Sequence, residues 1–339
     1  MNKIKIGVIG VGHLGRLHAG LYGDIEGIEL IGIFDIDSEK SYKVGQELNI
    51  KVFKDRNELL REVNAVSIVT PTSSHYENAL NALHNDCHIF IEKPIMASEE
   101  EALEIINLAK EKNKVLQIGH IERFNPAMLA LADVEIHPLF IESHRLASFS
   151  PRGTDVAVIL DLMIHDLDLI LTLVKSKPVQ IDASGVGVIS ETIDIANARI
   201  RFANGCIANV TASRISTKKM RKMRIFQPNS YISVDFIEGI SEIYFLCQDG
   251  YKKFNDGTLS ISLGNIASKE GEKEIKYTKL QRTGINPLKY ELTNFVDSIT
   301  AGLPPTVSGE DGLAALKLAN QVLKKIEEHS QSISERSVH

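Results

Sequence analysis

The stretch Ile4-Lys5-Ile6-Gly7-Val8-Ile9-Gly10-Val11-Gly12-His13-Leu14-Gly15 lies near the start of the chain. Its first half alternates and then becomes apolar, which predicts a buried strand, and its second half is a G-x-G-x-x-G pattern leading into a helix. Gly10 allows a tight turn, Gly12 lets the backbone approach a pyrophosphate, and Gly15 lets helix and strand pack closely. The N–H groups at the helix start would then hold phosphate. The stretch predicts a dinucleotide-binding unit.

The second predicted strand ends in an acidic residue at the spacing that such a unit requires. Asp35 follows Gly15 by 20 residues. A carboxylate there can accept hydrogen bonds from the adenosine ribose hydroxyls and would repel a 2′-phosphate. No arginine follows it, because the next residues are Ile36 and Asp37. The sequence therefore favours NAD over NADP, against the alternative of a doubly wound domain that binds no dinucleotide.

The first third of the chain alternates short apolar runs with helical patterns. This alternation is typical of a doubly wound parallel sheet with crossover helices, an α/β fold. The predicted strands are 4–9, 29–34, 65–69, 88–91 and 115–118. The predicted helices are 14–22, 38–48, 56–62, 76–83 and 98–112, the last with Ser98 and Glu101 in a capping-box pattern.

Beyond residue 125 the pattern changes to that of an α+β domain with a large, open and mostly antiparallel sheet. A strand near 136–146 and a helix at 155–174 precede a strand-rich stretch at 179–246, weak strand signals at 248–284, and helices at 287–301 and 309–329. The predicted domains are 1–123 for the dinucleotide and 124–329 for the substrate and oligomerisation. Residues 330–339 are predicted to form a frayed polar tail.

Composition limits the possible partners. The 339 residues suffice for two domains, and 44 acidic against 38 basic residues give a net charge of −6, with no global attraction to nucleic acid or an anionic membrane. Cys87, Cys206 and Cys247 form no C-x-x-C pair, so no disulfide framework or zinc site is predicted. The apolar stretch 156–174 contains four ionisable side chains, which would be costly in lipid. We expect a soluble cytoplasmic protein with no metal, nucleic-acid or membrane partner.

Three further motifs complete a family pattern. They are Thr70-Pro71-Thr72-Ser73-Ser74-His75, Glu92-Lys93-Pro94, and Asp161-Leu162-Met163-Ile164-His165-Asp166-Leu167-Asp168. Together with the glycine stretch they closely resemble the glucose–fructose oxidoreductase, inositol dehydrogenase and rhizopine catabolism family (Gfo/Idh/MocA) over nearly the whole chain. The resemblance implies an NAD-binding Rossmann domain followed by a domain built on an open sheet. The exposed face of that sheet commonly makes the oligomer, here a homodimer or homotetramer.

The resemblance also implies roles for individual residues. Lys93 would be catalytic, its ammonium stabilising the developing oxyanion, and His165 would accept the hydroxyl proton while Asp161 positions it. Asp161 and His165 stand four residues apart and would share one face of an α-helix. The alternatives without a catalytic role are that Lys93 is a solvated lysine at a strand end and that His165 is a histidine of the core. The expected cofactor-binding residues are Gly10, Gly12, His13, Leu14, Gly15, Asp35, Thr70, Pro71, Ser74, His75, Glu92 and Lys93.

Two segments point to a substrate class. Residues 119–126 and 151–156 resemble a subgroup of nucleotide-sugar dehydrogenases that oxidise the 3-hydroxyl of UDP-N-acetylglucosamine, whose 3-keto product is transaminated for lipid A or another surface glycan. The resemblance implies that Glu122, Arg123 and Asn125 line the sugar with Lys93, Asp161 and His165, and that Arg152 contacts the diphosphate. Interdomain salt bridges of Arg123 and Arg152 are the bland alternative.

Two other functions stay open. One is the dehydrogenation of a free polyol or aldose such as inositol or glucose, and the other is a non-catalytic NAD-binding sensor, which would need neither Lys93 nor His165. The basic run Lys218–Arg224 could present one row of charge to a UDP diphosphate. A solvated or oligomer-facing edge is the more common reason for such a run.

Overall fold

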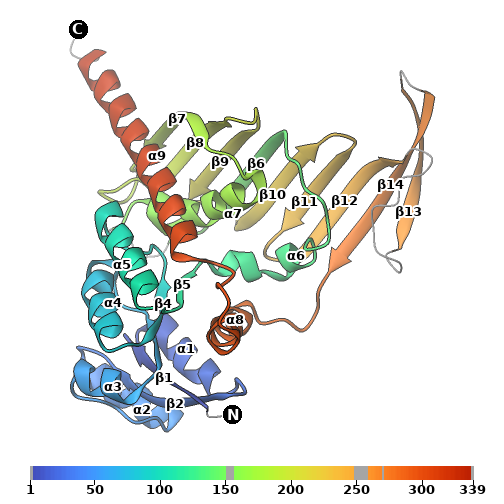
Figure 1. Ribbon diagram of the computed structural model, residues 1–339. Helices are drawn as coiled ribbons and strands as arrows, with labels where there is room; N and C mark the ends of the chain where they lie inside the picture. The colour runs from blue at the N-terminus through green and yellow to red at the C-terminus, as the bar shows by residue number, and fades with distance from the viewer. Residues whose placement is uncertain (1–2, 150–155, 248–258, 269–270, 337–339) are drawn as a thin grey trace. The chain divides into compact units, whose positions relative to one another are not determined.

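The computed structural model describes residues 3–149, 156–247, 259–268 and 271–336 (Figure 1). The chain forms two compact units, one made of Met1–Ile121 with Asn286–Leu316 and the other of Glu122–Ile285 with Lys317–His339. Residues 286–316 therefore belong with the first unit, whereas the expected division placed them in 124–329. The reason is apolar packing, described below.

The first unit is a parallel sheet with helices in its crossovers, so the doubly wound prediction is confirmed. The strand order is β2-β1-β3-β4-β5. The order of the strands along the chain reverses between β1 and β3, and open α/β sheets bind ligands at such a switch point. The strands are β1 Ile4–Ile9, β2 Ile28–Phe34, β3 Ala65–Ile68, β4 His88–Glu92 and β5 Leu116–Gly119. The helices are α1 His13–Tyr22, α2 Ser38–Leu48, α3 Arg56–Glu62, α4 His75–His84 and α5 Glu99–Glu111. Every predicted end is correct to within one residue, and Ser98 caps α5 by accepting the Glu101 N–H at 3.1 Å.

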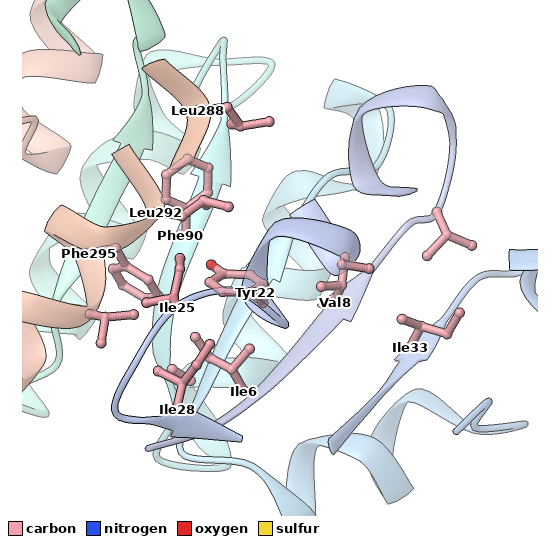
Figure 2. Close-up of a cluster of buried hydrophobic side chains, with 14 of the residues drawn as sticks. Ile6, Val8, Tyr22, Ile25, Ile28, Ile33, Phe90, Leu288, Leu292 and Phe295 are labelled. Atoms are coloured by element: carbon pink, nitrogen blue, oxygen red, sulfur yellow. The ribbon is translucent and has the colours of Figure 1, made fainter. Parts of the chain in front are cut away.

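A helix from late in the chain completes the first core. Helix α8 (Pro287–Ala301) presents Leu288, Leu292 and Phe295 to the side chains of β1, α1 and β4, and all three are buried (Figure 2). The Phe295 ring meets Phe90 edge to face at 5.9 Å. Burying each such side chain contributes about 1.5–3 kcal/mol. This apolar face is what joins residues 286–316 to the first unit.

The second unit contains the large, open and mostly antiparallel sheet that the sequence predicts, with nine strands among the described residues. The order is β13-β14-β12-β11-β10-β6-β9-β8-β7, and only the β6–β9 pair is parallel. The strands are β6 Phe140–Leu146, β7 Pro178–Val186, β8 Ile195–Phe202, β9 Ile207–Ser213, β10 Met220–Gln227, β11 Ser230–Asp235, β12 Ile240–Cys247, β13 Ser260–Ser268 and β14 Gly271–Gln281. One face packs against the short α6 (Pro126–Leu129) and α7 (Ile164–Val174).

Two sequence predictions for the end of the chain need correction. The weak strand signals at 248–284 correspond to two long strands, β13 and β14, which pair with each other along their length. The expected frayed tail is helical as far as Arg336, because α9 runs from Gly309 to Arg336, and residues 337–339 lie outside the described part. Among the described residues, no helix combines the length and apolar character needed to cross a bilayer.

The other face of the nine-stranded sheet carries a line of aromatic rings, here called the aromatic row. Strand register places one ring on each of five adjacent strands, with successive centroids 5.7, 5.0, 5.6 and 5.0 Å apart. The row consists of Phe140, Phe226, Tyr231, Tyr244 and Tyr277. Phe226 is 36% exposed, although a large apolar ring is normally buried.

A buried carboxylate anchors the turn before β8. Asp194 Oδ2 accepts the N–H groups of Val188, Ile189 and Ser190 at 2.7–2.9 Å. Burial alone would raise the pKa of Asp194, but these hydrogen bonds outweigh it and lower the pKa below the ordinary value of 3.8. The ionised form is therefore the one that stabilises the fold.

Replacing this carboxylate tests its contribution to stability. We expect Asp194→Asn to lower the free energy of unfolding at pH 7 by about 1–3 kcal/mol, because a neutral amide oxygen accepts the three N–H groups more weakly than the carboxylate does. The stabilisation is complete at a pH above the pKa of Asp194 in the unfolded chain. It is lost as pH falls through the lower pKa that Asp194 has in the folded protein. In urea titrations the gap between wild type and variant should therefore narrow below about pH 4. Exposed Asp182→Asn is the control, and an equal loss there would contradict the assignment.

Candidate active site

The three glycines of the first motif do different work. Gly10 has φ of +86°, and a Cβ there would lie 2.6 Å from the Val69 carbonyl oxygen. A Cβ on Gly15 would collide with the Gly10 carbonyl, so only glycine lets α1 begin this close to β1. Gly12, with φ of −60°, needs no special backbone, and a Cβ there would meet nothing within 4 Å.

The space beside Gly12 suits a dinucleotide. A cavity of about 590 Å³ is lined by Gly10, Gly12, Asp35, Thr70, Pro71 and Ser74, together with residues of α2, α3 and α4. It lies at the β1–β3 switch point, where the N-terminus of α1 directs its N–H groups. Protein packing does not require a glycine at position 12, but close approach of a pyrophosphate would. The residues present therefore fit the adenosine and pyrophosphate half of NAD.

The carboxylate of Asp35 is held at the edge of this cavity. Its Oδ2 accepts the N–H of Val11 at 2.7 Å and its Oδ1 accepts the N–H of Asp37 at 2.9 Å. These bonds tie the end of β2 to the glycine turn, where the ribose hydroxyls would lie. The other expected residues of the motif differ: His13 is exposed at the start of α1, whereas Leu14 packs against the core.

His75 is placed differently from its neighbours. Thr70, Pro71 and Ser74 line the cavity, but His75 does not, and its ring is buried. Its Nε2 lies 2.9 Å from the Thr70 carbonyl and its Nδ1 lies 3.0 Å from the Pro94 carbonyl. Burial lowers the pKa of His75, and the carbonyls of Thr70, Ile95 and Pro94 oppose that shift without cancelling it.

The Glu92-Lys93-Pro94 motif forms the end of β4. Lys93 is half-buried, and the Lys93–Pro94 peptide bond is cis. Glu92 is buried, with Oε2 accepting the Lys93 N–H at 3.2 Å and Oε1 lying 3.2 Å from His18 Nε2. The motif thus stands at the carboxyl end of a parallel strand, where the sequence predicted it.

In the second unit, the helix that carries Asp161 and His165 is not a uniform α-helix. Residues Ile159–Met163 form a π turn, with the Ile164 N–H reaching the Ile159 carbonyl, and α7 begins at Ile164. The expectation of one α-helix over 155–174 is therefore wrong here, and its start at 155 lies outside the described residues. π turns inside helices are frequent at functional sites. Asp161 and His165 are both half-buried.

The carboxylates that follow them are buried in ion pairs. Asp166 accepts Arg145 Nε at 2.6 Å and Ser143 Oγ at 2.8 Å. Asp168 accepts Arg123 through two bonds, at 2.8 and 2.6 Å. Such bidentate pairs fix orientation as well as charge, so they hold α7 in one rotational setting.

Three residues expected to line the sugar belong to this same buried group. Glu122 accepts Arg145 Nη1 at 2.7 Å, and Asn125 donates to Glu122 at 3.0 Å. Burial would lower the pKa of Arg145, but the two carboxylates outweigh it and raise the pKa, so the guanidinium stays charged. Arg152 lies outside the described residues. Sequence reasoning missed Arg145, whose only signal is its inward position in the alternating run of β6.

The basic run lies on β10 from Met220 onward, in the interior of the sheet rather than at an edge, and Lys218 and Lys219 precede the strand. Lys222 pairs with Asp235 at 2.9 Å and Arg224 with Glu142 at 2.7 Å, each across to a neighbouring strand. Acidic residues therefore neutralise this part of the exposed face.

Two family models match the chain. One, described as an oxidoreductase family with an NAD-binding Rossmann fold, matches residues 4–120, and the other, described as the GFO/IDH/MocA C-terminal domain, matches 142–229. The chain belongs to the Gfo/Idh/MocA oxidoreductase family. Its first domain is accordingly the NAD-binding Rossmann domain of that family, and NAD is its cofactor, as the sequence predicted.

Relatives within the Gfo/Idh/MocA family extend over the whole chain. UDP-N-acetylglucosamine 3-dehydrogenase of Acidithiobacillus ferrooxidans is 38% identical over 328 residues, covering 96% of this chain and 98% of the relative. Its solved structure has a TM-score of 0.83 at 37% identity, covering 97% and 99% of the two chains. Myo-inositol 2-dehydrogenase of Thermotoga maritima is 24% identical over 346 residues, covering 96% and 97%. The solved structure of a probable dehydrogenase from Thermotoga maritima, with a TM-score of 0.77 at 23% identity and coverage of 96% and 97%, shares the fold.

Gly12 separates cofactor binding from folding in this Gfo/Idh/MocA domain. We expect Gly12→Val to raise the Kd for NADH at least tenfold, or about 1.4 kcal/mol, because the new side chain enters the pyrophosphate space. The thermal midpoint should move by less than about 2 °C, since a Cβ at this position would meet no protein atom within 4 Å. NADH fluorescence titration and calorimetry measure the two effects. Unchanged NADH affinity would place the pyrophosphate elsewhere, and Gly15→Ala should in contrast destabilise the fold.

Proposed function

We propose that this protein is a cytoplasmic NAD-dependent dehydrogenase that oxidises the 3-hydroxyl of UDP-N-acetylglucosamine to a 3-keto sugar. The observation that carries the proposal is the full-length similarity, at 38% identity, to an enzyme of that name. The glycine turn and the Asp35 carboxylate support it because they fit NAD, and Lys93 supports it because it lies at the carboxyl end of a parallel strand, where open α/β sheets bind ligands. The 3-keto product would then be the substrate of a transamination that leads to a surface glycan or lipid A.

Three residues would carry the proton chemistry. Bound NAD supplies the acceptor for the hydride. The Lys93 ammonium hydrogen-bonds the reacting hydroxyl oxygen and stabilises its developing negative charge. His165 takes the hydroxyl proton as the hydride leaves, for which an imidazole is suited near neutral pH. Asp161, in the π turn that precedes α7, orients the substrate and the base.

The remaining expected sugar contacts take a supporting place in the proposal. Arg123 is bound to Asp168 on α7, and Glu122 and Asn125 belong to the buried group around Arg145. Their role is to fix the helix that bears His165, while side-chain contact with the sugar falls mainly to Lys93, Asp161 and His165. Arg152 remains the proposed diphosphate contact.

A second candidate is the oxidation of a free polyol. It is favoured by the similarity to myo-inositol 2-dehydrogenase over 96% of this chain, although at 24% identity. A non-catalytic NAD sensor is the third candidate, and it predicts NAD binding without turnover.

Turnover of a substrate panel distinguishes these functions. Purified protein should form NADH with NAD and UDP-N-acetylglucosamine, and not with inositol, glucose or UDP-glucose, at mildly alkaline pH with a ketone trap. We expect Lys93→Met to lower kcat by about 10²–10³-fold, the range for losing one hydrogen-bond donor to a developing oxyanion, with NADH affinity within threefold. Turnover of free sugars alone would support the second candidate. NADH binding with no turnover of any alcohol would support the sensor.

We also propose that the aromatic row makes a homodimer or homotetramer. Partly exposed rings spanning five strands form an apolar patch that a second copy can cover, and the neighbouring residues offer both signs of charge. The family resemblance points to the same face.

Sedimentation tests this interface. Wild type should sediment as a dimer or larger at micromolar concentration, and Phe226→Asp should shift it toward monomer, because a carboxylate would be buried without a partner. Leu103→Asp, at a 50% exposed position on α5 of the first unit, is the control. A monomeric wild type, or a Phe226→Asp protein that assembles normally, would refute the proposed interface.

A further inference from the structure

Two buried histidines flank the Glu92-Lys93-Pro94 turn, one on each side. His18 comes from α1, the helix that starts at the glycine turn, and His75 comes from the start of α4. Their exposed fractions are 0% and 1%. Neither residue lines the dinucleotide cavity. Their position in the first unit calls for a role other than contact with the cofactor.

His18 acts on the turn through Glu92. Its ring lies edge-on to Phe90 at 5.3 Å and to Tyr22 at 6.5 Å, and its Nε2 lies 3.2 Å from Oε1 of the Glu92 carboxylate. The other oxygen of that carboxylate accepts the Lys93 N–H. The carboxylate of Glu92 thus joins α1 to the backbone of Lys93.

Gly119 leaves space for this carboxylate. A Cβ at that position, on the neighbouring strand β5, would lie 2.8–2.9 Å from all three atoms of the Glu92 carboxyl group. Contacts that short do not occur in folded proteins, so any larger residue would displace the carboxylate. The lack of a side chain at Gly119 on β5 is therefore what allows the Glu92 carboxylate its position on β4.

His75 acts on the other side of the turn. Its Nδ1 lies 3.0 Å from the Pro94 carbonyl and 3.3 Å from the Ile95 carbonyl, while its Nε2 faces the Thr70 carbonyl at 2.9 Å. It therefore connects the segment after β3, which lines the cavity, to the segment after β4.

We propose that His18 and His75 are positioning residues that fix the backbone on either side of Lys93 and thereby aim its ammonium. The proposal rests on the catalytic role proposed for Lys93. A lysine side chain has four rotatable bonds, so the protein controls the ammonium chiefly through the backbone that bears it and the walls around it. A displacement of about 1 Å in a reacting group can cost 10²-fold in rate.

Paired amide substitutions test each contact. Glutamine places its NH₂ near the position of histidine Nε2, whereas asparagine places it near Nδ1. His18→Gln should therefore keep an N–H group beside Glu92, and His18→Asn should not. At position 75 the order reverses, because His75→Asn places its N–H group near the Pro94 carbonyl and His75→Gln places it near the Thr70 carbonyl. We expect His18→Asn and His75→Gln to lower kcat ten- to a hundredfold, and the partner variant at each position to recover most of the loss.

Two further measurements exclude a general loss of structure. NADH affinity should stay within threefold in all four variants, and exposed His84→Asn on α4 should behave as wild type. In a Lys93→Met background, His18→Asn and His75→Gln should cause no further loss of the residual rate, since both act through Lys93. Equal losses for the two amides at one position, or additive losses in that background, would overturn the positioning role.

The last readout requires neither substrate nor bound cofactor. The rate at which acetic anhydride labels Lys93, followed by mass spectrometry, should change at least threefold in His18→Asn and His75→Gln but not in His84→Asn. An unchanged labelling rate overturns the inference whatever reaction the protein catalyses. A changed labelling rate together with a fully active Lys93→Met protein would instead refute the proposed function. The positioning of Lys93 by His18 and His75 would still hold in that case.

Discussion

The close approach of α1 to β1 is the constraint on which the first unit depends. It exists because Gly15 lies against the carbonyl of Gly10, where any side chain would collide. The same contact sets the far end of the helix, so that Tyr22 enters the core and donates or accepts a hydrogen bond with Ser67 at 2.6 Å. Cofactor space, core packing and the position of His18 beside Glu92 all follow from one backbone contact.

In the second unit, the orientation of α7 depends on ion pairs between charged side chains. Glu122, Asp166 and Asp168 are buried there with Arg145, and the half-buried Arg123 pairs with Asp168. Removing one partner from a buried pair typically costs about 3–5 kcal/mol, because the other charge stays without compensation. Buried ion pairs of this kind add little net stability, but they permit very few rotations of α7. The arrangement therefore favours a single orientation for the side chains that α7 carries toward solvent.

Local patterns predicted the first unit well because its strands, turns and caps are set by residues close in sequence. Gly10, Asp35 and Ser98 each act on neighbours within one or two elements. The ion pairs of the second unit could not be predicted in this way, since Arg145 meets Glu122 and Asp166 only when β6, the 3₁₀ turn Ile121–Phe124 and α7 come together. The π turn at Ile159–Met163 was equally hidden, because nothing in its apolar composition distinguishes it from an α-helix.

The packing of α8 has a consequence for synthesis of the chain. The residues that complete the first core, Leu292 and Phe295 among them, come after the whole nine-stranded sheet in sequence order. A ribosome delivers residues from the N-terminus, and N-terminal domains generally fold first. The nascent Rossmann sheet therefore emerges before α8 can cover the apolar side chains that it later buries, Phe90 and Tyr22 among them. These side chains stay uncovered until residue 295 has left the exit tunnel. The domain that begins the chain is therefore completed only after most of the second unit has been made.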